Sequence, residues 1–99
     1  MSTPKTGLKI PASNGTPERL SSTDKTLYTR LWVQAKTNNS GVVGVGDSNV
    51  VADAGASQRG RVFAAGAGDW LYNVRPYDIY VDSATTGDGV IWFAETPNA

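Results

Sequence analysis

From residue 27 to residue 95 the chain is a succession of short apolar segments separated by Gly, Asn, Asp, Ser and Thr. Residues 27–36 alternate with a period of two, which is typical of a half-buried strand. No stretch sustains the 3.6-residue period of a helix. The spacing predicts six to eight short strands and an all-β fold, namely a small β-sandwich or jelly-roll-like domain with an extended N-terminal arm.

The expected strands are apolar segments bounded by turn residues. Leu31 and Val33 share one face of the first, whereas Tyr28, Arg30 and Trp32 share the other, which we expect to be partly exposed. The last segment is apolar on both faces, as is typical of a central strand. The set comprises residues 27–36, 42–46, 50–51, 61–63, 69–74, 77–81 and 90–94.

Residues 1–26 differ from the rest of the chain, because they are rich in Pro, Ser and Thr and contain few large apolar residues. We therefore divide the chain into an N-terminal arm, residues 1–26, and a β-sandwich domain, residues 27–99. Leu8, Ile10 and Leu20 are the sizeable apolar residues of the arm. Two interpretations are open, a loosely ordered tail or an arm that adds a strand to a neighbouring subunit.

The composition excludes several function classes. Nine basic and nine acidic residues give no net charge, which argues against nucleic acid and anionic membranes as partners. The chain contains no histidine and no cysteine, the side chains most used for proton transfer, metal binding and nucleophilic attack near neutral pH. We expect no enzyme activity, no cofactor and no metal. No apolar run is long enough to span a bilayer, and residues 1–5 do not resemble a secretion signal.

Four short motifs suggest chemistry that their surroundings do not support. Residues 46–49, Gly-Asp-Ser-Asn, resemble the start of a serine-hydrolase block, but that nucleophile needs a base, normally histidine. Residues 53–56, Asp-Ala-Gly-Ala, lack the hydroxyl that follows the aspartate in aspartic proteases. Residues 44–46 lack the helix that follows a nucleotide-binding turn. Asp82 and Asp88 lack calcium-loop spacing and are expected in a solvated turn.

The carboxylates and aromatic residues leave three interpretations open. Enzyme activity could depend only on a pair of carboxylates such as Asp78 and Asp82, and we expect these two to be separate solvated groups. Arg59 and Arg61 form too small a basic patch for nucleic acid. Tyr28 and Trp32 share the polar face of one strand and are assigned to a contact between subunits. Aromatic side chains also stack on sugars, so carbohydrate recognition stays open.

From residue 31 to residue 93, about two-thirds of its length, the chain resembles a recurrent pattern of small tailed-phage virion proteins. In that pattern an apolar strand ending in Gln-Ala precedes an Asn/Gly turn and a strand ending in Val-Gly-Asp-Ser, as in residues 31–48 here. An Ile-Tyr-Val strand follows a later loop, as at residues 79–81. The chain departs from the pattern at residues 65–68, where a Pro-Gly turn is usual.

The resemblance implies a capsid decoration or cement protein on the outer surface of the virion. Its partner would be the major capsid protein, and a homotrimer is the expected oligomer. Within that interpretation we assign the arm residues to the capsid contact and the polar face of residues 27–36 to the contact between copies. These residues are Leu8, Ile10 and Leu20 for the capsid, and Tyr28, Arg30 and Trp32 for the copies. The alternative is a carbohydrate- or receptor-binding module of a phage tail or head fibre.

Overall fold

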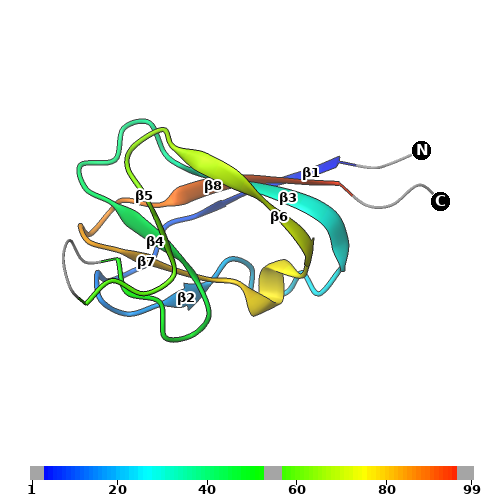
Figure 1. Cartoon of the computed structure of the whole chain (residues 1–99), viewed down its shortest axis with the longest axis horizontal. Coiled ribbons are helices and arrows are strands. Elements are labelled where there is room, and N and C mark those ends of the chain that lie inside the picture. The colour runs from blue at the N-terminus through cyan, green and yellow to red at the C-terminus, as the bar shows by residue number, and fades with distance from the viewer. Residues whose placement is uncertain (1–3, 53–56, 96–99) are drawn as a thin grey trace.

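The computed structural model describes residues 4–52 and 57–95 (Figure 1). Within them the chain forms eight strands and one turn of 3-10 helix, η1, at Pro76–Asp78, which confirms the all-β prediction. None of the described residues form a helix suited to crossing a bilayer. In chain order the strands are β1 (Pro4–Lys9), β2 (Glu18–Arg19), β3 (Tyr28–Ala35), β4 (Val43–Gly46), β5 (Arg61–Phe63), β6 (Gly68–Val74), β7 (Tyr80–Ser83) and β8 (Val90–Glu95).

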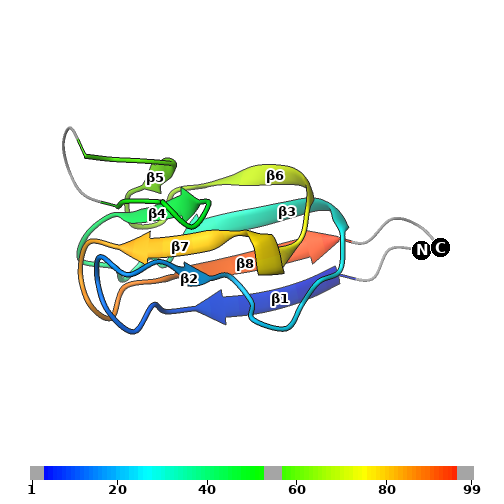
Figure 2. The ribbon, with the colours of Figure 1, turned by 90° about the horizontal axis from the view of Figure 1, so that it is seen from below.

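The strands form two four-stranded antiparallel sheets, packed one above the other in Figure 1. One sheet has the order β1-β8-β3-β6, which can be followed across Figure 2, and the other has the order β2-β7-β4-β5. The last apolar segment, β8, lies between β1 and β3, so its predicted central position is confirmed. The predicted sandwich is confirmed as well.

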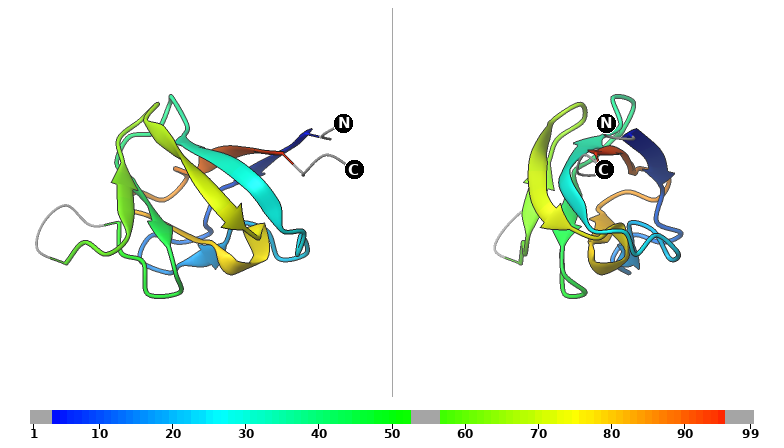
Figure 3. Two further views of the ribbon diagram at one scale, coloured as in Figure 1. Left: turned by 45° about the vertical axis from the view of Figure 1, so that its right-hand side comes forward. Right: turned by 90° about the vertical axis from the view of Figure 1, so that its right-hand side faces the viewer.

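The pairing of the strands defines the topology. β1 pairs with β8, β2 with β7, β3 with β6 and β4 with β5. The first four strands therefore pair with the last four in reverse order, as in one long antiparallel hairpin. The hairpin is rolled so that β3 also pairs with β8 and β4 with β7 (Figure 3). This arrangement of eight strands in two sheets is a jelly roll.

The core lies between the sheets, where alternate residues of each strand point inward. Leu31 and Val33 of β3 are fully buried, as their spacing predicts. Tyr28 corrects the prediction: it is only 2% exposed, because its ring packs near Trp92 and its hydroxyl donates a 2.7 Å hydrogen bond to the buried Asp24. It stands at the first residue of β3, where the chain leaves the loop that holds Asp24.

The N-terminal segment is extended, as expected, but it pairs with its own chain. β1 is an edge strand on β8, and β2 pairs with β7 of the opposite sheet. Lys9 of β1 forms an ion pair with Glu18 of β2 at 2.8 Å, and Lys5 of β1 forms one with Asp24, in the loop before β3, at 2.9 Å. The described part of residues 1–26 is therefore built into the sandwich, and the boundary predicted near residue 26 lies in the loop before β3.

Candidate interaction surface

The outer face of the β1-β8-β3-β6 sheet carries the large side chains that the core leaves out. Since Leu31 and Val33 of β3 point inward, Trp32 between them points outward. In the same way Trp92 and Ala94 of β8 are buried, so Phe93 lies on the outer face. No described element covers this side of the sheet (Figure 1).

The register of the strands aligns these outward residues in rows. Phe93 of β8 stands opposite Trp32 of β3, which stands opposite Trp70 of β6. On one side of this row Leu8 of β1 stands opposite Ile91 of β8. On the other side Arg30 of β3 stands opposite Tyr72 of β6. We call this surface the outer aromatic face, and it comprises Leu8, Arg30, Trp32, Trp70, Tyr72, Ile91 and Phe93.

The two tryptophans of the outer aromatic face pack against each other. The ring centroids of Trp32 and Trp70 lie 5.4 Å apart at 67°, an edge-to-face arrangement that aromatic quadrupoles favour. The indole N–H of Trp32 donates to Gln34 Oε1 at 3.1 Å, so its polar atom has a partner. The two indoles therefore have a defined geometry in the free chain, which reduces the side-chain entropy that a binding event would cost.

Arg30 adds a charge to this aromatic row. Its guanidinium carbon lies 4.5 Å from the centre of the Trp70 ring, within the range of a cation–π interaction. The same guanidinium donates from Nε and Nη2 to the two carboxylate oxygens of Glu95, at 3.0 and 3.2 Å. This paired hydrogen bond raises the pKa of Arg30 above its ordinary value. The Arg30 guanidinium is therefore a cation placed between the Glu95 carboxylate and the Trp70 ring.

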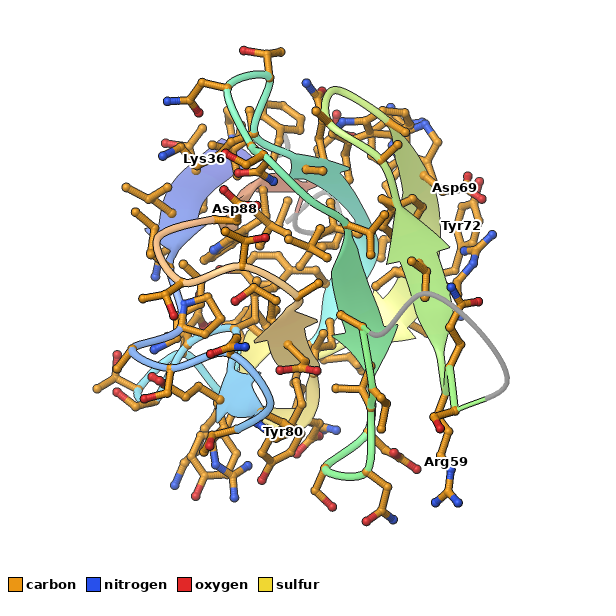
Figure 4. The ribbon with its side chains drawn as sticks, turned by 90° about the vertical axis from the view of Figure 1, so that its left-hand side faces the viewer. Lys36, Arg59, Asp69, Tyr72, Tyr80 and Asp88 are labelled. Carbon is orange, nitrogen blue, oxygen red and sulfur yellow. The ribbon has the colours of Figure 1, made fainter. Side chains whose placement is uncertain are left out.

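Several apolar side chains of the outer aromatic face are largely open to solvent. Tyr72 is 63% exposed, Leu8 58% and Ile91 42%. Figure 4 shows Tyr72 on the side of β6 that faces away from the core. Single exposed apolar residues are ordinary, but adjacent ones on one side of a sheet are typical of an interaction site.

The structure brings together three of the six residues assigned from the sequence. Leu8, Arg30 and Trp32 all lie on the outer aromatic face, although they were assigned to two different contacts. Ile10 follows β1 and is 40% exposed. Leu20 is 2% exposed in the core, and Tyr28 is equally buried, so neither can contact a partner from the surface of the folded chain. Their assignments are corrected.

Sequence reasoning missed the other half of this surface. Trp70 and Tyr72 alternate with Leu71 along β6, and Leu71 packs against the core, so a period-two pattern was present but short. The sequence does not single out Ile91 and Phe93, because β8 is apolar on both faces and the pattern does not indicate which face lies outside. The strand is central, yet its outer side has no covering layer among the described residues.

Asp82 and Asp88 are buried supports for loops, which corrects their assignment to a solvated turn. The two carboxylate oxygens of Asp82 accept backbone N–H groups of Gly15 and Ala52, at 2.9 and 2.8 Å. Asp88 accepts the backbone N–H groups of Ser40 and Gly41. Among the described residues there is no group of three or more acidic side chains that could hold a metal ion.

The other described motifs noted in the sequence belong to a strand and a turn. Residues 44–46 end β4, and residues 46–49 form the predicted turn, in which Asp47 accepts the backbone N–H of Asn49 at 2.9 Å. Residues 53–56, the motif compared with aspartic proteases, lie outside the described residues. A pocket of about 290 Å³ is lined by Asn14, Gly15, Val51, Ala52, Asp82, Ser83 and Ala84. Both carboxylate oxygens of Asp82 are used by backbone N–H groups, and the buried Ser83 hydroxyl has no hydrogen-bond partner among the described residues.

Comparisons of the chain with protein-family models, curated proteins and solved structures find no match. The outer aromatic face is therefore interpreted from its own residues. A rigid pair of indoles, a fixed cation and exposed aliphatic side chains can bind a partner by burial and stacking.

Proposed function

We propose that this protein is a non-enzymatic decoration protein of a tailed-phage head, which binds the outer capsid surface and bridges capsid subunits. The observation that carries the proposal is the outer side of the central apolar strand β8, which no described element covers and where Ile91 is 42% exposed beside the 58% exposed Leu8. The solvated side of an antiparallel sheet is usually polar, so an apolar outer side is typical of an interaction site. A capsid protein would cover this side.

The fold supports the proposal by analogy. Jelly rolls are common in viral capsid domains and in lectins, and the order of all eight strands here follows that plan. One fold hosts many functions, so the fold alone does not indicate this role. It agrees with the resemblance of residues 31–93 to small tailed-phage virion proteins. The absence of histidine and cysteine from the chain agrees with a protein that acts by binding.

Stabilisation of the head would follow from mass action. A protein that binds the mature shell and not its open or disassembled forms stabilises that shell by its binding free energy, multiplied over many symmetry-related copies. In this scheme Leu8 and Ile91 contact capsid protein, while Arg30 and Trp32 contact a neighbouring copy. A homotrimer would present three such capsid contacts at once and gain avidity.

A binding assay with capsids tests the proposal. Undecorated heads of the source phage are mixed with the purified chain, and bound protein is measured by sedimentation. Ile91→Glu places a charge in the contact and is expected to weaken binding about tenfold or more. Ser48→Glu makes the same change of charge in the exposed β4–β5 turn and is expected to bind like the wild type. Equal binding by both variants would contradict the proposal.

Carbohydrate or receptor binding on a tail or head fibre is the second candidate. The observation that favours it is that hydrogen-bonding groups accompany the indoles, since sugar sites combine aromatic rings with such groups. Gln34 accepts the indole N–H of Trp32, and Glu95 accepts from Arg30, which lies against Trp70. Host polysaccharide would then change the tryptophan fluorescence of the purified chain in a saturable manner. Capsid binding without such a change favours the decoration role.

A further inference from the structure

The chain has no net charge, but its charged side chains are unevenly distributed over the surface. Four of the nine basic residues make ion pairs within the chain, and these occupy four of the nine carboxylates. Asp82 and Asp88 are buried and used by backbone donors. Five basic residues have no carboxylate within 4.0 Å among the residues that the structure describes: Arg19, Lys25, Lys36, Arg59 and Arg75.

Three of these five cations gather around the turn η1. The guanidinium carbon of Arg19 lies 3.8 Å from the ring centre of Tyr77 and 4.9 Å from that of Tyr80. The ammonium of Lys25 lies 4.6 Å from the ring centre of the same Tyr77. Arg75 directly precedes η1 and is exposed. We call Arg19, Lys25, Arg75, Tyr77 and Tyr80 the η1 cluster.

Arg19 is held in place by more than its charge. One of its terminal nitrogens donates a 2.6 Å hydrogen bond to the backbone oxygen of Tyr77, and its guanidinium carbon lies within 4.9 Å of the centres of two tyrosine rings. The neighbouring carboxylate of Glu18 is engaged with Lys9. Asp78 supplies one exposed carboxylate in the same turn, so the cluster keeps an excess of positive charge. A guanidinium fixed in this way loses little freedom when it binds a carboxylate.

The η1 cluster is separate from the outer aromatic face. Arg19 is on β2 and Tyr80 is on β7, which are neighbours in the other sheet. In Figure 4 Tyr80 lies in the lower part of the view near β7, whereas Tyr72 lies on the right, beside β6. A ligand of this cluster would therefore leave the outer aromatic face free.

We propose that the η1 cluster is a second binding site, and that it binds an acidic polypeptide segment of a partner protein. Arg19 pairs with one carboxylate through its remaining N–H groups, which match a carboxylate in two-point geometry. Lys25, on the same ring, attracts a second carboxylate. The tyrosine rings pack against the methylene groups of the glutamate or aspartate side chains. Three cations are too few for a nucleic-acid footprint.

Titration of the full-length chain with a capped hexaglutamate peptide, followed by NMR of the ¹⁵N-labelled protein, tests this site. We expect saturable shifts confined to residues around Arg19 and Tyr77, and weaker binding as NaCl is raised. Arg19→Gln is expected to weaken binding about tenfold, because it removes a charge-assisted pair. Lys25→Gln, at an exposed position that leaves the fold intact, is expected to weaken binding about threefold.

The control separates a site from general attraction to positive charge. Arg59→Gln removes an exposed cation outside the η1 cluster and is expected to bind hexaglutamate like the wild type, and hexaglutamine is expected not to bind. The proposal is overturned if no saturable shift occurs, or if Arg19→Gln and Arg59→Gln weaken binding equally. It is also overturned if heparin binds at Arg19 while hexaglutamate does not. None of these results depends on capsid binding.

Discussion

Gly7 shows how closely β1 is fitted to the sandwich at the level of one residue. A Cβ atom at this position would overlap the indole of Trp92, which is 5% exposed and fills the core beneath β1. We expect Gly7→Ala to lower the free energy of unfolding by about 1–3 kcal/mol, the usual cost of an added methyl group in a packed core. Urea denaturation measures the change.

Thr6→Ala is the matched control for this prediction, because Thr6 is the preceding residue of the same strand and is exposed. We expect it to change the free energy of unfolding by less than about 0.5 kcal/mol. If Gly7→Ala were no more destabilising than Thr6→Ala, the contact between β1 and Trp92 would not be as described.

Asp24 makes the stability of the fold depend on pH. Burial raises its pKa, but hydrogen bonds from Lys5, Tyr28 and Thr26 outweigh this and lower the pKa from 3.8 to about 2. The charged form is therefore favoured in the folded chain. Its contribution, roughly 2 kcal/mol for a shift of this size, is complete above the unfolded pKa of 3.8 and is lost as pH falls through about 2.

Unfolding by urea at pH 6 and at pH 2 tests this prediction. The wild type is expected to lose more stability between the two pH values than Asp24→Asn does, by roughly 2 kcal/mol. Asp47→Asn, in an exposed turn, is expected to keep the wild-type difference. An identical loss in the wild type and in Asp24→Asn would show that Asp24 is not the titrating group.

At the level of elements, the first two strands are part of the fold and not an accessory. β1 covers Trp92, β2 pairs with β7, and Leu20 after β2 lies in the core. We expect a chain that lacks residues 1–26 to be unfolded, because it loses an edge strand from each sheet and exposes the core. Circular dichroism and the dispersion of an NMR spectrum measure this directly. A well-folded shortened chain would support a separate arm.

The sequence predicts most strands well and the pairing of the first two poorly. The alternation of Leu31 and Val33 with Trp32 identifies β3 because it runs through a whole strand. β2 spans only Glu18–Arg19, too few residues for any period, and its place in a sheet depends on β7, far along the chain. β7 begins later than predicted, at Tyr80, because Pro76 begins η1 instead.

The candidate site was only half predictable for a related reason. Arg30 and Trp32 are placed by the period of their own strand, whereas Trp70 and Phe93 join them through register between strands. Register follows from the topology of the whole sheet, which a local pattern does not encode. The η1 cluster likewise joins Arg19 to Tyr77 across a long stretch of chain.

At the level of the whole molecule, two surfaces of different chemistry lie on the two sheets. The outer aromatic face is suited to a stable apolar contact, and the η1 cluster is suited to a salt-sensitive one. In sedimentation with heads, binding through the outer aromatic face is expected to persist from low to high NaCl. A steep loss of binding with salt would instead assign the capsid contact to the η1 cluster.

Cryo-electron microscopy of decorated heads would show which surface of the chain contacts the capsid. We predict regular density on the outer shell, with the β1-β8-β3-β6 sheet turned toward capsid or neighbouring subunits and with Ile91 and Trp32 within the contact. Density in which this sheet faces solvent, or density for the chain only on tail fibres, would contradict this prediction.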